Sequence, residues 1–170
     1  MISADDYLDS AYHPDREYID GLLVKRCEPT TGHALLQVLV VVCLSQYRKQ
    51  LHFGLLTEAR TQIVARSRYR IPDVMLCPLP LPAGKIVDSI PLAVIEILSP
   101  DDTISEQLAR FREYQQIGVR HMVLLDPEEM IAYRFADGSL IATGFTSLEL
   151  PAGPLPFDTA ALFRQLAEER

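Results

Sequence analysis

The chain has 170 residues, of which 48% are hydrophobic and 23% charged, a composition that fits an ordinary globular protein and excludes a disordered or fibrous chain. Its formal net charge is −7, whereas a protein that holds nucleic acid over its whole surface by counterion release is usually basic. A nucleic-acid function must therefore rest on a local basic patch or on metal ions.

The same features predict one domain over residues 1–170 in a reducing, cytoplasmic setting. The first ten residues begin acidic and lack a basic segment followed by an apolar one, so no signal peptide is expected. The longest strongly apolar run, Ala34 to Leu44, is shorter than the roughly 20 residues that span a bilayer, so no membrane partner is expected. Three irregularly spaced cysteines give neither a disulfide framework nor a C-x-x-C motif: Cys27, Cys43 and Cys77.

The N-terminal half predicts two helices and several short strands. Ser3 can cap a short helix that runs to about Ser10. The segment from Glu17 to Val24 predicts two strands around an Asp20-Gly21 turn, and His33 to about Leu51 predicts a helix that is apolar almost all round and therefore covered on most sides. Strand-like segments follow at 55–59, 62–65 and 71–77, and a proline-rich loop at 78–88.

The C-terminal half begins with a continuous apolar run from Ile90 to Leu98, which is interrupted by one charge, Glu96, and is typical of a central strand covered on both faces. A capping box at Thr103 opens a helix from about Ile104 to Ile117, and Gly118 ends it. The remaining pattern predicts strands at 121–126, 130–135 and 147–150 and a final helix at 159–168. Together these elements indicate an α/β fold.

Two carboxylates stand in apolar surroundings. Asp73 follows Pro72 at the start of a hydrophobic strand, and Glu96 interrupts another. A buried carboxylate without a partner costs several kcal/mol or shifts its pKa, so each must be compensated. One interpretation is an ion pair with an arginine. The other is a divalent-metal site, in which acidic side chains at the ends of adjacent strands hold Mg²⁺ or Mn²⁺ through oxygen ligands.

The order of several short motifs resembles a known family. The strings EYIDGLLV, GHALLQ, RIPDVML, VIEILSP, FREYQQIGV and HMVLLDP look like the Uma-two family of bacterial restriction-endonuclease-like domains, over Ser3 to about Phe163. That family is similar to the PD-(D/E)XK nuclease superfamily. The resemblance implies a restriction-endonuclease-like α/β fold, with a mixed central sheet flanked by helices, and a Mg²⁺-dependent endonuclease that hydrolyses DNA.

The resemblance also implies roles for individual residues. Asp73 matches the Asp of PD and Glu96 the acidic residue of (D/E)XK, both as metal ligands. Glu17 matches an early glutamate that could join or orient the metal site, and His33 matches the polar residue that opens the long helix. Taken alone, His33 is more typical of a partly buried helix cap than of a ligand.

Two positions depart from the family pattern and bear on catalysis. Leu98 stands where the superfamily lysine would follow, and the compensating lysine of many family members aligns with Arg110. An arginine can balance charge on a phosphate but cannot lose a proton near neutral pH, so Arg110 cannot activate water by proton exchange. Leu22 stands where family members usually carry a glutamate, which leaves one acidic group fewer near the site.

These features leave three hypotheses. The first is a Mg²⁺-dependent endonuclease, placed first because both acidic positions are present. The second is a catalytically silent member of the same fold that binds DNA or another protein, which the departures at Leu98 and Arg110 favour. The third makes the carboxylates ion-pair partners of Arg110 and Arg70. A homodimer is expected by analogy with the cutting of both strands.

A basic stretch precedes Asp73 in the sequence. Arg66, Arg68 and Arg70 alternate, so in an extended chain they would share one face. Such a face predicts either contact with nucleic-acid phosphates or the solvated tip of a hairpin.

Overall fold

A computed structural model describes residues 1–170, which form four helices and three sheets. The helices are α1 (Ala4–Asp9), α2 (Thr31–Ser45), α3 (Ile104–Ile117) and α4 (Thr159–Glu169). None of them combines the length and apolar content that a membrane crossing requires.

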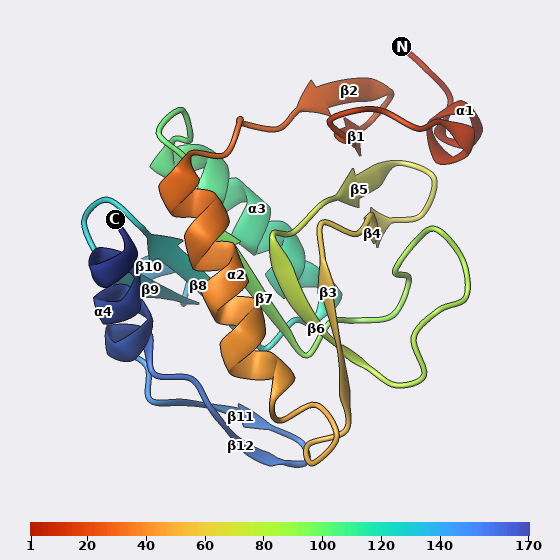
Figure 1. Ribbon diagram of the computed structural model, residues 1–170. Coiled ribbons are helices and arrows are strands. Elements are labelled where there is room, and N and C mark those ends of the chain that lie inside the picture. The colour runs from red at the N-terminus through yellow and green to blue at the C-terminus, as the bar shows by residue number, and fades with distance from the viewer.

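The centre of the molecule is a six-stranded mixed sheet (Figure 1). Its strands, in spatial order, are β10 (Ser139–Ala142), β9 (Ile131–Ala136), β8 (His121–Asp126), β7 (Ala93–Ile97), β6 (Val74–Pro78) and β3 (Phe53–Thr57). Only β7 and β8 run parallel, joined by α3 as the crossover, and every other neighbouring pair is antiparallel. The predicted mixed sheet flanked by helices is therefore confirmed.

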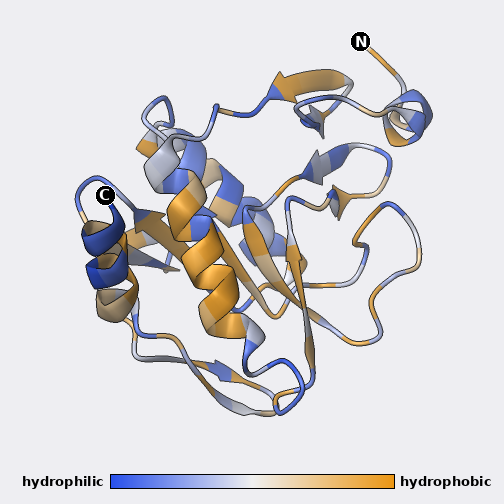
Figure 2. Ribbon diagram, viewed as in Figure 1, coloured by the Kyte–Doolittle hydropathy of each residue, from blue (hydrophilic) through white to orange (hydrophobic).

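Helices cover the sheet on both faces, which explains the unbroken apolar runs of its central strands. On β7, Ala93 and Ile95 belong to the core that α2 and α4 cover, whereas Val94 belongs to the core that contains Phe111 of α3. Alternate residues of a strand point to opposite faces, so both sets must be apolar. Figure 2 shows hydrophobic residues along most of α2, as expected of a helix with so little polar face.

A smaller sheet and a hairpin complete the fold. The four-stranded antiparallel sheet has the order β2 (Leu22–Lys25), β1 (Arg16–Ile19), β5 (Arg68–Arg70) and β4 (Thr61–Val64). It packs with α1 through a cluster of tyrosine rings that includes Tyr7, Tyr18 and Tyr69. The hairpin consists of β11 (Ser147–Leu150) and β12 (Gly153–Pro156).

Several predicted boundaries are wrong for local reasons. Helix α2 begins at Thr31, because the Thr30 side chain accepts from the amide of His33, and it ends at Ser45 rather than Leu51. The following residues form turns that lead into β3. Strands β5, β10 and β12 were not predicted. β12 carries two prolines, which argue against a strand because proline lacks a ladder donor.

The glycine that ends α3 meets a requirement of the backbone for a left-handed conformation. Gly118 caps the helix in the left-handed region, with φ of 100°, and a Cβ added there would meet Ile90 only at an ordinary 3.6 Å. Replacing it with alanine should therefore cost about 1 kcal/mol through backbone strain rather than a clash. Urea unfolding of Gly118→Ala measures this cost. Gly84→Ala, where nothing lies within 4 Å, is the control, and equal stabilities of the two variants would contradict the assignment.

Candidate functional site

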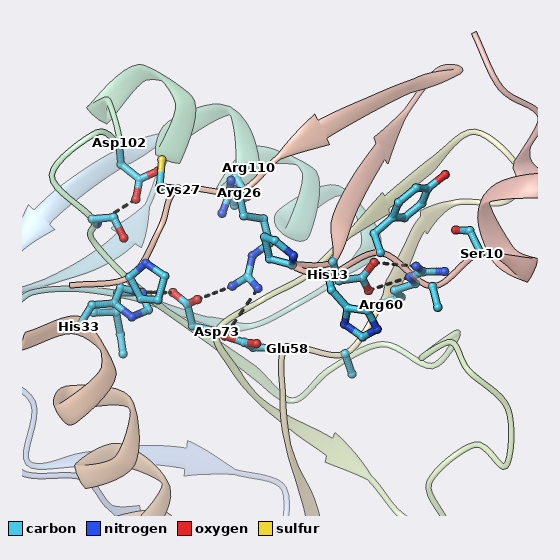
Figure 3. A pocket seen from close by; sticks show the side chains of 18 of the residues that line it. Ser10, His13, Arg26, Cys27, His33, Glu58, Arg60, Asp73, Asp102 and Arg110 are labelled. Carbon is cyan, nitrogen blue, oxygen red and sulfur yellow. Dashed lines mark hydrogen bonds and ion pairs between the residues drawn. The ribbon is translucent and has the colours of Figure 1, made fainter. Parts of the chain in front are cut away.

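A cleft of about 720 Å³ opens beside the ends of β6 and β7 (Figure 3). One wall comes from the segment between α1 and β1, and another from the segment between β2 and α2 together with the first turn of α2. Asp73, His33 and Arg110 line it, and Ile97 marks the end of β7. The cleft thus collects three residues that the sequence predicts as functional.

Asp73 lies just before β6 and is only 4% exposed. Its Oδ1 accepts from Nη2 of Arg26 at 2.7 Å, and its Oδ2 accepts from the amide of Ile97 at 2.8 Å and lies 3.3 Å from Nε2 of His33. Burial alone would raise the pKa of Asp73, but the hydrogen bond from His33 and the charges of His33 and Arg26 outweigh it and hold the pKa below its usual value. Asp73 is therefore an ionised carboxylate at neutral pH.

Glu96 lies on β7, directly beside Asp73. The register pairs Val74 with Ile95, and the amide of Asp73 donates to Oε2 of Glu96 at 3.4 Å. The Tyr114 hydroxyl of α3 donates to Oε1 at 2.7 Å. Burial raises the pKa of Glu96 to about 7. The charge of Arg110, whose Nη1 lies 3.8 Å from Oε2, lowers the pKa but offsets the loss of hydration only in part. The charge of Asp73 opposes ionisation of Glu96 and raises the pKa further.

Glu17 is fully buried on β1 and has strong partners of its own. Its Oε2 accepts from Nη1 of Arg70 at 2.7 Å, and its Oε1 accepts from the amide of Ile71 at 3.2 Å. Arg110 lies between Glu17 and Glu96, with Nη2 3.6 Å from Glu17. Burial opposes the charge of Arg110, but Glu96 and Glu17 outweigh it and raise its pKa further. Arg110 is therefore a permanent cation beside the site.

The structure holds no group of three or more His, Cys, Asp and Glu side chains placed to bind a metal ion. The predicted set of Asp73, Glu96 and Glu17 therefore does not form one cluster, and Glu17 faces arginines instead. The donor set that remains for a cation is the pair Asp73 and Glu96.

His33 does not cap α2, because Thr30 does so. Its ring is buried, contacts Asp73 through Nε2, and leaves Nδ1 without a hydrogen-bond partner. Burial would lower the pKa of His33, but the hydrogen bond to Asp73 and its charge outweigh this and raise it. His33 therefore contacts Asp73 and does not cap the helix.

The three arginines before Asp73 do not share one free face. Arg66 takes a left-handed conformation with φ of 59° in the turn before β5, so the alternation holds only for Arg68 and Arg70. Arg66 pairs with Asp5 at 2.7 Å, whereas Arg68 and Arg70 both donate to Glu113 of α3. Any contact with nucleic-acid phosphates would have to compete with these ion pairs.

Sequence reasoning missed Arg26 and Glu113, two residues that the site depends on. Arg26 contacts Asp73 from 47 residues away, and Glu113 contacts Arg70 from 43 residues away. Both lie in polar surroundings, where a charged residue predicts a solvated surface, so no local signal distinguishes them. Only the folded arrangement reveals their partners.

Comparisons with known proteins show the family and the fold of the chain. A family model, Uma2, described as "Putative restriction endonuclease", matches residues 4–154. A solved structure, described as "a putative nuclease belonging to DUF820 from Anabaena variabilis ATCC 29413", matches with a TM-score of 0.79 and 22% identity over 98% of this chain and 99% of that one. This likeness shows a shared fold.

A second solved structure, described as "cryoEM structure DrdV-DNA complex", matches with a TM-score of 0.36 and 15% identity over 75% of this chain and 11% of that one. A likeness this weak supports no argument about function. No curated protein matches the chain.

The ion pairs of the arginine stretch predict unequal effects on stability. Arg70→Ala should lower the free energy of unfolding by about 3 to 5 kcal/mol, because it leaves Glu17 and Glu113 buried without their shared partner. Arg66→Ala, whose side chain is 70% exposed, should change it little. Urea unfolding of both variants is the measurement, and similar losses in both would show that the Arg70 network is not what stabilises this region.

The raised pKa of Glu96 predicts how stability depends on pH. A carboxyl group with a pKa of about 7 in the folded protein, against 4.5 ordinarily, binds its proton more tightly when folded, so its ionisation costs stability as the pH rises through that interval. The expected loss is at most about 3 kcal/mol. Glu96→Gln retains an acceptor for Tyr114 but has no proton to lose.

Unfolding free energies of wild type and Glu96→Gln should therefore diverge between pH 5 and pH 7, with the wild type falling more steeply. The interval from pH 5 to pH 6 is the most informative, because stability linked to the raised pKa of His33 declines only above its ordinary value of 6.5. Parallel curves for the two proteins would contradict the raised pKa of Glu96.

Proposed function

Because the chain belongs to the Uma2 family, we propose that it is a Mg²⁺-dependent endonuclease that hydrolyses phosphodiester bonds in DNA. The observation that carries the proposal is the adjacency of Asp73 and Glu96, two buried carboxylates beside a cleft, one directly before β6 and the other on β7. Buried charges of like sign oppose each other's ionisation, so their adjacency calls for a role beyond stability.

The pair fits the ligand preference of Mg²⁺. This ion takes hard oxygen ligands and is usually bound through one or two carboxylates, with waters and substrate phosphates completing its coordination. Asp73 and Glu96 supply such a pair without Glu17. Carboxylate oxygens also suit Mn²⁺. When bound there, such an ion supplies a Lewis acid for phosphodiester hydrolysis.

The residues around the carboxylate pair have roles in which they neither gain nor lose a proton. Arg110 lines the cleft, and its guanidinium can donate to a phosphate as negative charge develops there. Its buried Nε has no hydrogen-bond partner in the structure. The hydroxyl of Tyr114 fixes the orientation of Glu96, and His33 with the amide of Ile97 fixes that of Asp73.

Two properties of the proposed enzyme follow from the substrate. DNA is the partner, held in the cleft near the carboxylate pair. Cleavage of both strands of a duplex needs two sites, so we propose that two copies of the chain act together as a homodimer.

A second candidate function is a catalytically silent member of the fold that binds DNA or another protein. The observation that favours it is the pairing at the site: Arg26 and Arg110 lie beside Asp73 and Glu96, and no lysine pairs with either carboxylate. An arginine cannot relay a proton at neutral pH. The two candidates differ in whether phosphodiester bonds are broken.

Nicking of supercoiled plasmid and of single-stranded DNA, with Mg²⁺ or Mn²⁺, separates the candidates. We expect slow, metal-dependent cleavage by the wild type, because Arg110 stabilises charge but does not activate water. Arg110→Lys should retain or raise the rate, since a lysine keeps the charge and can exchange a proton. Asp73→Ala should abolish cleavage, since it removes half of the carboxylate pair.

Calorimetry with Mn²⁺ accompanies the cleavage assay and should show that Asp73→Ala and Glu96→Ala lose metal binding. If all variants are equally inert although the wild type binds both metal and DNA, the chain is a silent member of the fold. If the wild type binds no metal at millimolar concentration, the metal-dependent proposal fails.

A further inference from the structure

Arg26 makes the shortest contact that either carboxylate of the pair forms with a cation. It lies between β2 and α2, in a segment without regular secondary structure, and its Nη2 is 2.7 Å from Oδ1 of Asp73. Its side chain is 16% exposed and lines the cleft. Figure 3 shows Arg26 and His33 both directed at Asp73. The position where a divalent ion would approach Asp73 is thus next to a fixed positive charge.

The two oxygens of Asp73 are not equally available. Oδ2 already receives the amide of Ile97 and the ring of His33, and a carboxylate oxygen has about two lone-pair sites. Oδ1 has Arg26 as its sole partner. An ion bound by Asp73 must therefore use the remaining lone pair of Oδ1, where the positive charge of the adjacent Arg26 guanidinium opposes it.

Arg26 also has a second carboxylate within reach. Its Nη1 lies 3.6 Å from Oε1 of Glu58, whose side chain is 49% exposed and lines the same cleft. The guanidinium of Arg26 therefore lies between a buried carboxylate and a partly exposed one. A small rotation of a long side chain would exchange the first for the second without moving the backbone.

Within the proposed metal-dependent function, on which this step rests, we propose that Arg26 is an internal counter-cation. It occupies Asp73 in the metal-free protein, and a divalent ion bound by Asp73 and Glu96 displaces it toward Glu58. The arginine balances a buried charge that would otherwise destabilise the empty site. It also sets the metal concentration at which the site fills.

Calorimetric titration with Mn²⁺ tests the competition through binding alone. Arg26→Gln should tighten metal binding by about tenfold, because the ion no longer displaces a cation. Glu58→Gln should weaken it by about threefold, because the displaced guanidinium loses its alternative partner. Lys85→Gln removes an exposed positive charge from the same cleft and should leave the affinity unchanged, since solvent screens that charge.

The double variant Arg26→Gln/Glu58→Gln distinguishes two explanations for an effect of Glu58: that it receives the displaced Arg26, or that it attracts the metal ion directly. If Glu58 acts through Arg26, its substitution has no further effect once Arg26 is absent. If Glu58 merely attracts the ion, its substitution weakens binding equally in both backgrounds, and the exchange is overturned. Near-UV circular dichroism confirms that each variant is folded. Should Arg26→Gln not fold, Arg26→Lys takes its place, because a lysine keeps the charge but cannot bridge two carboxylates with a planar fork. Glu58→Gln should then weaken Mn²⁺ binding less in the Arg26→Lys background than in the wild type, and equal weakening in both would overturn the exchange.

The outcomes for this inference and for the proposed function are distinct. Wild type and Arg26→Gln binding Mn²⁺ with equal affinity would overturn the role of Arg26 and leave a metal-dependent nuclease intact. Binding by Arg26→Gln alone would support the competition between Arg26 and the ion but overturn the metal-dependent function of the wild type. No binding by either protein would overturn both.

Discussion

The burial of Glu96 beside Asp73 is the constraint on which the rest of the site depends. Two carboxylates cannot both be ionised in a dry interior unless donors and cations surround them. Asp73 receives the Ile97 amide, a histidine and Arg26, whereas Glu96 receives the Tyr114 hydroxyl, a long contact from the Asp73 amide and a distant arginine. The two groups therefore differ in pKa, which is lowered for Asp73 and raised for Glu96, and because both are buried the difference follows from their unequal partners.

This constraint organises elements that lie far apart in the chain. Helix α3 supplies Tyr114 and Arg110, α2 supplies His33, and the small sheet supplies Glu17 with its arginine partner. Buried ion pairs are weak contributors to stability compared with apolar groups of the same size, whereas breaking one is costly. The network thus connects three parts of the fold at a place where apolar side chains would stabilise the protein equally well. The proposed nuclease function accounts for that choice.

The sequence could predict the members of the site that interrupt a strong pattern. Asp73 and Glu96 stand out because each breaks an apolar strand, and the bounds of α3 agree with prediction because its capping box and Gly118 are local signals. Arg26 carries no such signal, since its partner is set by strand pairing and by the path of the chain before α2. The metal ligation implied for Glu17 remains a prediction, and in the structure its carboxylate binds Arg70 and the Ile71 amide.

The arrangement also determines what a divalent ion would have to displace. A carboxylate must be deprotonated to bind a metal, so an ion at the pair competes with a proton on Glu96, whose pKa is about 7, and with Arg26 on Asp73. The first competitor depends on pH and the second does not. Because Arg110 cannot take up the proton displaced from Glu96, solvent in the cleft would accept that proton. In the proposed nuclease, metal binding is therefore coupled to release of the proton from Glu96. Arg26 shifts the same binding equilibrium, because it competes with the ion for Asp73.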